Sequence, residues 1–223
     1  MLEILYKSKN AVVINKPQGM PSAPDPSRDK DAMNLSAEML RKDGENGDLW
    51  LVHRLDRGTG GLLMFARNKR TAAALSEILR EHLLVKEYIA VVEGRAEDSE
   101  MQDYIYKDNS SSRAVITDSD AKGAVSARLY SRVIDTVMTD KGERSLVYIT
   151  LETGRFHQIR AQFSHRGLPL VGDGKYGSKD KRARVPALYS AHLSLTLGNE
   201  KIDCSALPDS ASYPWCLFDL SKI

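Results

Sequence analysis

The sequence has little cysteine, no long hydrophobic run and almost no excess charge of either sign. Cys204 and Cys216 are its only cysteines among 223 residues, too few for a disulfide framework or a four-cysteine zinc site. We expect two reduced thiols in a cytoplasmic protein. No apolar run approaches the roughly 20 residues of a membrane helix, and residues 1–10 lack the pattern of a signal peptide. Lys and Arg number 32 against 30 Asp and Glu, so any basic surface is local.

Metal and cofactor motifs are also missing. The five histidines show no HExxH spacing, and Gly58, Gly60 and Gly61 fit neither the GxxxxGK[ST] nor the GxGxxG spacing of a phosphate-binding loop. We therefore expect no metal and no haem. There is no internal repeat. A length of 223 residues with 42% hydrophobic residues suits a buried core, and we expect a single domain over residues 1–223.

The pattern of apolar residues predicts more strands than helices. Strands are expected at 3–6, 11–15, 49–52, 62–66, 88–92, 124–133, 145–151, 188–195 and 201–204. Helices are expected at 32–41, from the N-cap Asn68 to about Leu84, and at 155–166. Residues 94–123 are polar and are interpreted as a loop or short hairpin. Because several strands follow one another directly, the fold class is α+β with a mostly antiparallel sheet rather than a doubly wound fold.

The segment HRLDRGTGG (53–61) is the first candidate for chemistry. It lies between two apolar strands, and its aspartate, Asp56, stands two residues after Arg54 and directly before Arg57. Opposite charge nearby keeps a carboxylate ionised. An ionised carboxylate can act as a nucleophile or electrostatic stabiliser at a sugar carbon. Composition alone favours the alternative, a surface Asp–Arg pair that closes a turn.

The segment LETGRFHQIR (151–160) is the second candidate. If a helix starts near Thr153 or Gly154, its free amides could hold an anion, and His157 and Arg160 would share one helical face. The alternative is an ordinary amphipathic helix with a solvated basic side.

Two further features are less distinctive. Tyr88 enters a strand and could either stack on a base or fill the core. Residues 175–184 carry five Lys or Arg against one Asp, with Tyr176 among them, a composition that suits a polyanion backbone or a solvated loop equally well.

Taken together and in this order, the motifs resemble the RluA-type family of RNA pseudouridine synthases. The resemblance spans about residues 3–195 and is carried by NKPQG (15–19), HRLD (53–56), KEY (86–88), TGRFHQIR (153–160) and GLPLVGD (167–173). The chain departs from the family where it has Gly60, Phe156 and Tyr189-Ser190, positions at which the family commonly has Ser, Thr and Leu-His.

The resemblance implies a pseudouridine synthase fold, a mostly antiparallel mixed sheet with flanking helices and a central catalytic cleft. It also implies an isomerase that needs no cofactor and converts uridine to pseudouridine. Asp56 matches the essential aspartate, which in one route attacks the sugar and in another removes a sugar proton. Tyr88 matches the tyrosine that stacks on the base, and Arg160 the arginine that pairs with the aspartate. These three residues should therefore converge at the floor of one cleft.

The resemblance implies RNA as the partner, with no DNA and no membrane. The expected substrate is a stem-loop of large-subunit ribosomal RNA or transfer RNA, bound by a monomer that has no separate N-terminal RNA-binding domain. Arg54 matches a position that can enter the stack vacated by a flipped base. The expected substrate-binding residues are Lys16, Arg54, Arg57, Arg155 and His157. Together with Arg160, Arg166 and residues 175–184, the arginines would line one basic groove.

Two other functions are compatible with these residues. A catalytically idle RNA-binding or ribosome-assembly factor of the same fold would bind RNA without changing it. A hydrolase that uses Asp56 on a nucleoside would need a second carboxylate as acid or base, and no such partner stands out near either motif.

Overall fold

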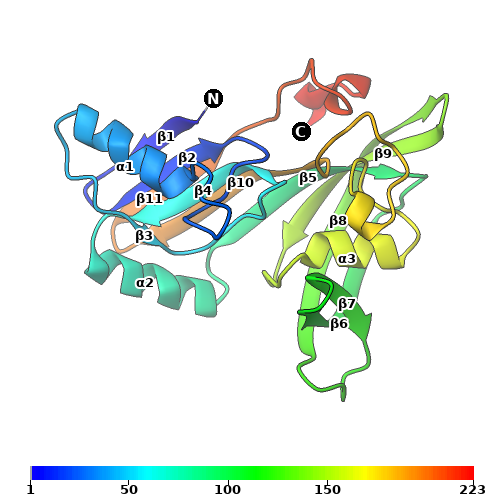
Figure 1. Cartoon of the computed structure of the whole chain (residues 1–223), viewed down its shortest axis with the longest axis horizontal. Coiled ribbons are helices and arrows are strands. Elements are labelled where there is room, and N and C mark those ends of the chain that lie inside the picture. The colour runs from blue at the N-terminus through cyan, green and yellow to red at the C-terminus, as the bar shows by residue number, and fades with distance from the viewer. Residues whose placement is uncertain (1) are drawn as a thin grey trace. The chain divides into compact units, whose positions relative to one another are not determined.

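The computed structural model describes residues 2–223 and divides them into two compact units (Figure 1). The first contains the chain up to Lys86 together with Tyr189–Leu207, and the second contains Glu87–Leu188 together with Pro208–Ile223. Each unit is built around its own strands.

The first unit is a mixed sheet with two helices. Its strands are β1 (Glu3–Lys7), β2 (Ala11–Lys16), β3 (Trp50–Leu51), β4 (Gly60–Ala66), β10 (Leu188–Leu197) and β11 (Glu200–Ser205). Strand β2 lies between β1 and β4 and is antiparallel to both, and β3 also pairs with β4. Strand β10 runs parallel to β4 at its start and antiparallel to β11 further on. The parallel pair makes this sheet mixed.

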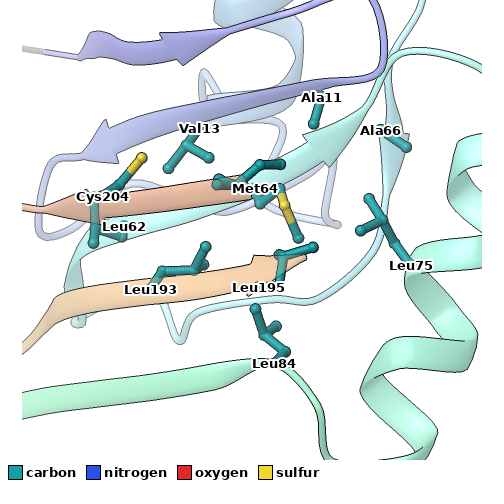
Figure 2. Packing of buried hydrophobic residues seen from close by; sticks show 11 residues of the cluster. Ala11, Val13, Leu62, Met64, Ala66, Leu75, Leu84, Leu193, Leu195 and Cys204 are labelled. Atoms are coloured by element: carbon teal, nitrogen blue, oxygen red, sulfur yellow. The ribbon is translucent and has the colours of Figure 1, made fainter. Parts of the chain in front are cut away.

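The core of this unit lies around β4. All seven residues of β4 are buried because neighbours cover both its edges and both its faces. Figure 2 shows Leu62 and Met64 of β4 beside Val13 of β2 and Leu193 of β10. Leu75 of helix α2 also packs on this cluster. A strand buried on both faces loses the simple alternation of apolar and polar residues.

Both helices of the first unit begin after a capping side chain, and the cap predicted at Asn68 is confirmed. Helix α1 (Ala32–Lys42) is capped by the Asp31 carboxylate, and helix α2 (Lys69–Arg80) by Asn68, whose side chain accepts the Thr71 N–H. The expectation that α2 reaches Leu84 is wrong. His82 adopts a left-handed backbone conformation with φ 57°, which stops the helix after Arg80.

The second unit is an antiparallel sheet in the order β5-β9-β8-β6-β7. Its strands are β5 (Val85–Glu93), β6 (Ser99–Asp108), β7 (Arg113–Thr117), β8 (Val125–Thr139) and β9 (Gly142–Leu151). The loop interpretation of residues 94–123 is wrong and the hairpin alternative is confirmed, since β6 and β7 pair antiparallel. Polar side chains hid this hairpin, because one face of it is open to solvent.

Helix α3 (Gln158–His165) is shorter than the sequence predicts. Residues 153–157 form a turn in which the Gln158 side chain accepts the Arg155 N–H and the Thr153 hydroxyl. His157 then takes a left-handed conformation, φ 51°, as the residue before the helix. The helix therefore starts at Gln158, not at Thr153, Gly154 or Arg155. Short 3₁₀ turns at Gly174–Tyr176, Trp215–Leu217 and Leu220–Lys222 complete the unit.

The fold class, α+β with a mixed, largely antiparallel sheet, is confirmed. The remaining predicted strands are present, each one to five residues longer than expected, except that 49–52 shrinks to Trp50–Leu51. In the part of the chain that the structure describes, none of the helices has the length and apolar character needed to cross a membrane.

Candidate active site

The loop that carries Asp56 joins β3 to β4 and is fixed by the loop that follows β2. The Ser22 hydroxyl accepts the Leu55 N–H at 3.0 Å and donates to the Leu55 carbonyl at 2.8 Å. Both Ser22 and Leu55 are buried. One hydroxyl thus holds both backbone groups of the residue directly before Asp56.

Further contacts join the same two loops. The Gly19 N–H donates to the Arg57 carbonyl at 2.8 Å, and the Arg57 Nε donates to the Gly19 carbonyl at 3.0 Å. The Gln18 amide donates to the Gly58 carbonyl at 2.9 Å. The Arg57 guanidinium also forms an ion pair with Asp29. Arg57, expected to bind substrate, therefore braces the loop of Asp56.

Lys16 lies beneath these loops with no exposed surface. Its ammonium donates to the carbonyls of Met20 at 2.8 Å, Pro17 at 3.1 Å and Arg57 at 3.4 Å. Burial lowers the pKa of Lys16 to about 8, although the negative charge of Asp56 opposes this shift. Through these contacts the buried amine holds its loop and places a positive charge near Asp56.

Asp56 itself opens a turn, since its carbonyl accepts the Thr59 N–H at 3.0 Å. Its side chain is half-buried, whereas Arg54 on one side and Arg57 on the other are exposed. His53, at the start of the segment, accepts the Met64 N–H at 3.1 Å through Nε2. Burial lowers the pKa of His53 to about 4, so the ring stays neutral and remains able to accept.

The glycines after the turn are required by close packing. At Gly61, which has φ 100°, an added Cβ would lie 2.2 Å from the Ser190 carbonyl oxygen. At Gly60 a Cβ would lie 2.8 Å from the Gln18 side chain and 2.9 Å from the Tyr189 ring. The Tyr189 hydroxyl donates to Asn15 Oδ1 at 2.6 Å. Gly60 and Tyr189, two departures from the family pattern, thus lie in contact and fit each other.

Tyr88 and Arg160 lie in the second unit. Tyr88 is a buried residue of β5, opposite Ile149 of β9. Arg160 of α3 makes a two-pronged ion pair with Asp173, with Nε to Oδ2 at 2.6 Å and Nη2 to Oδ1 at 2.8 Å. Both side chains are buried. The Asp173 carboxylate therefore fixes the plane of the Arg160 guanidinium.

Asp173 is itself fixed by the segment before it. Residues 169–171 run along β5: the Val171 N–H donates to the Val91 carbonyl at 2.9 Å, and the Glu93 N–H donates to the Pro169 carbonyl at 2.9 Å. This pairing fixes the motif GLPLVGD along β5, so that the carboxylate of its last residue, Asp173, lies beside helix α3.

His157 does not share a helical face with Arg160, because it precedes the helix. Its Nδ1 lies 3.0 Å from the Tyr176 hydroxyl, and its ring stacks on Phe156 with 3.8 Å between centroids. Arg155 is exposed and its Nε donates to the Ser126 carbonyl at 3.0 Å, a contact that ties the turn to β8.

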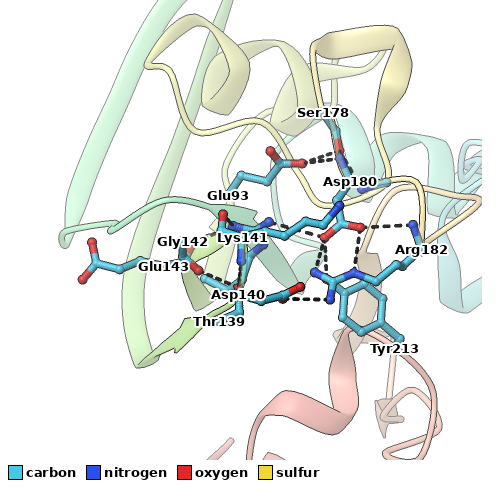
Figure 3. A network of polar contacts seen from close by, with 12 residues as sticks. Glu93, Thr139, Asp140, Lys141, Gly142, Glu143, Ser178, Asp180, Arg182 and Tyr213 are labelled. Atoms are coloured by element: carbon cyan, nitrogen blue, oxygen red, sulfur yellow. Dashed lines mark hydrogen bonds and ion pairs between the residues drawn. The ribbon is translucent and has the colours of Figure 1, made fainter.

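The basic stretch 175–184 is organised by a buried carboxylate (Figure 3). Asp180 accepts from Arg182, from Arg144 at 3.3 Å and from the Tyr213 hydroxyl at 2.5 Å. The Arg182 guanidinium holds the pKa of Asp180 well below its usual range. Arg182 is thus occupied within the protein, whereas the described structure shows no ion pair for Lys179 or Arg184.

The structure thus places the expected site residues in two groups. Lys16, Arg54, Asp56 and Arg57 belong to the first unit, and Tyr88, Arg155, His157 and Arg160 to the second. Convergence of Asp56, Tyr88 and Arg160 in one cleft stays a prediction.

Sequence reasoning missed three supporting residues. Ser22 carried no signal within a proline-rich loop. Asp173 closes the motif GLPLVGD, and Tyr189 stands out in the sequence only as a departure from the family pattern. The sequence could have indicated Asp173, because it is the one acidic residue of the motif GLPLVGD and a carboxylate can pair with Arg160.

The fold is that of the pseudouridine synthases. The solved structure of human RNA pseudouridylate synthase domain containing 1 matches with a TM-score of 0.77 over 96% of this chain and 86% of that one, at 24% identity. The chain belongs to the RNA pseudouridylate synthase family, whose model matches residues 10–165. The resemblance to RluA-type enzymes is thereby confirmed.

Two relatives illustrate the family. The ribosomal large subunit pseudouridine synthase C of Rickettsia conorii is 33% identical over 79% of this chain and 57% of its own length. The tRNA pseudouridine synthase C of Haemophilus ducreyi is 34% identical over 82% of this chain and 77% of its own. The chain spans less than two thirds of the Rickettsia protein and of two Bacillus subtilis relatives, 62% and 58%.

Proposed function

We propose that this protein converts uridine to pseudouridine in RNA and that Asp56 starts the reaction. The observation that carries the proposal is the family match over residues 10–165, because that range contains all eight expected site residues. The braced loop around Asp56 supports it, since a catalytic carboxylate must be held in one place.

The reaction is an isomerisation in which atoms balance without a co-reactant. The bond between N1 of uracil and C1′ of the ribose breaks, a bond between C5 and C1′ forms, and the C5 proton is lost while N1 gains one. Asp56 either attacks C1′ or removes a sugar proton so that the base departs. Both routes need an ionised carboxylate, and the buried charge of Lys16 favours that form.

Arg160 and Tyr88 complete the proposed catalytic set. Arg160 pairs with Asp56 when substrate is bound, and Asp173 holds it in the required orientation. Tyr88 stacks on the target base and assists loss of the C5 proton. His157 and Arg155 belong to the turn that leads into α3, and their proposed role is to bind the RNA near Arg160.

The proposed substrate is a structured RNA, a stem-loop of large-subunit ribosomal RNA or of transfer RNA. Relatives carry both names. A paired base is out of reach, so the uridine must flip out of its stack, at a cost of about a few kcal/mol that is lowest in a loop. Arg54 is exposed and its planar guanidinium suits the vacated stack.

The test is a map of pseudouridine in total RNA from cells with and without the protein, together with purified protein and unmodified RNA. The expected result is one or a few uridines that become pseudouridine only when the protein is present. RNA binding without product on every RNA would identify an idle binding factor, and release of free uracil would identify a hydrolase.

A further inference from the structure

A small cavity lies beside the Asp56 loop within the first unit. It has a volume of about 220 Å³ and is walled by the loop after β2, at Pro21–Asp25, and by the segment that precedes Asp56. Pockets for drug-sized ligands are larger, roughly 300–1,000 Å³, so this one suits a single ring. Apolar groups contributed by proline, alanine and leucine line it: Pro21, Ala23, Pro24, Leu51 and Leu55.

Some polar side chains of the lining already have hydrogen-bond or ion-pair partners within the described part of the protein, and one does not. The Ser22 hydroxyl is used twice by Leu55, and Arg57 is paired with Asp29. Arg54 differs, because its exposed guanidinium forms no hydrogen bond or ion pair with any residue that the structure describes. An exposed arginine at the rim of a small apolar cavity is available to a ligand.

The charges in the lining indicate which part of a nucleotide enters. Asp25 accepts from the Ser27 N–H at 2.9 Å, and this contact and the Ser27 hydroxyl lower the pKa of its carboxyl, so it stays ionised. A negative charge in the wall disfavours a phosphate inside the cavity. A neutral base inside the cavity avoids this repulsion, provided that its phosphate stays outside.

The cavity adjoins the loop that carries Asp56. Leu55, in its wall, is the residue directly before Asp56, and Arg54 is one residue earlier. Two residues of extended chain span at most about 7 Å, which is comparable to one step along an unstacked RNA strand. Leu51 leaves the cavity accessible, since 42% of its surface is exposed.

We infer that this cavity binds a second, unstacked base, adjacent in the RNA to the uridine at Asp56. The inference rests on the proposed function and adds a subsite to it. Because the Ser22 hydroxyl is occupied, the cavity recognises a flat ring by contact and reads little of its hydrogen-bonding edge. Holding the neighbouring base apart from the stack keeps the target uridine flipped.

The probe is the trinucleotide UpUpU, compared with two versions that lack the base at the 5′ or the 3′ end. Binding to the full-length protein is followed by the backbone amide signals of Ser22 and Leu55, two lining residues that none of the variants replaces. Loss of the base at one end should weaken binding about tenfold, the scale of one stacked base. Ala23→Trp fills the cavity, so this variant should bind all three probes equally weakly.

The control is Leu207→Trp, which adds the same ring at another partly exposed leucine outside the cavity and should keep the tenfold effect. If Ala23→Trp does not fold, Leu51→Ala replaces it and should reduce the effect to about threefold. An equal effect of base removal in wild type and cavity variants, or no effect at either end, would overturn the inference.

The pseudouridine map separates the two claims. Pseudouridine formation without a base effect at the cavity would refute the subsite alone. A base effect that vanishes in the cavity variants, without pseudouridine formation, would keep the subsite and refute the catalytic proposal.

Discussion

The Ser22 hydroxyl holds both backbone groups of Leu55, the residue directly before Asp56. Ser22→Ala leaves a buried N–H and a buried carbonyl unpaired, which costs about 1–3 kcal/mol of unfolding free energy. The proposed activity should fall as well, because the carboxylate loses its brace. Chemical denaturation and single-turnover pseudouridine formation measure the two effects.

Ser76→Ala is the matched control. Ser76 donates to the Ala72 carbonyl on the exposed surface of α2. Its loss should change stability by less than about 0.5 kcal/mol and leave activity intact. Equal effects of the two substitutions would mean that Ser22 does not position the loop.

Asp56→Asn tests the proposed nucleophile or base directly. The substitution keeps the size of the side chain and removes its negative charge, so turnover should vanish while RNA affinity changes less than about threefold. Asp29→Asn, which changes an exposed carboxylate paired with Arg57 at the loop surface, serves as the control and should keep most activity. Substantial turnover by the Asp56 variant would disprove its assignment.

Asp173→Asn tests how Arg160 is held. Breaking a buried ion pair on one side leaves a buried charge and costs about 3–5 kcal/mol. We expect this loss of stability together with a lower kcat at saturating RNA. Asp140→Asn removes the exposed partner of Arg182 and should cost less than about 1 kcal/mol. Retained full turnover by Asp173→Asn would show that the Asp173 pair is structural only.

Lys16 gives stability a specific pH dependence. Its pKa in the folded protein is about 8, below its ordinary value of 10.5, so between these values the unfolded chain holds more protons. Stability from this group therefore rises with pH across that window, by about 2 kcal/mol from pH 8 to pH 10. The difference between wild type and Lys16→Met, measured by urea unfolding, should grow by that amount. A flat difference would contradict the burial of a titrating amine.

Gly60 and Tyr189 should be energetically coupled. Gly60→Ala places a methyl group against the Tyr189 ring and should cost about 1–3 kcal/mol. Tyr189→Leu makes room, so the double variant should be more stable than the two single effects predict. Strict additivity in denaturation experiments would mean that the two residues do not constrain each other.

The order of elements could be predicted from the sequence because most strands and caps carry local signals. Asn68 before an amphipathic run marked the start of α2, and the apolar run at β2 marked a buried strand. The end of α2 carried no such signal, since it depends on the backbone of His82. The early end of α2 and the late start of α3 both come from left-handed residues other than glycine, which sequence patterns do not indicate.

The proposed catalytic residues Asp56, Tyr88 and Arg160 could be selected from motifs in the sequence. The residues that hold them through contacts within the protein could not. The sequence does not indicate a role for Ser22, because its partner Leu55 lies 33 residues away. Only the folded chain brings the Ser22 hydroxyl to the Leu55 backbone. Arg57 and Arg166 were assigned to an RNA groove from charge alone, yet each has an aspartate partner within the protein.

The three carbonyl contacts of Lys16 have a consequence for chemical labelling. An amine with no exposed surface cannot meet an acylating reagent until the loops after β2 and before β4 separate. The labelling rate of Lys16, compared with that of the exposed Lys201, therefore measures how often the scaffold of Asp56 opens. Bound RNA that stabilises this scaffold would slow the labelling of Lys16 without touching the lysine.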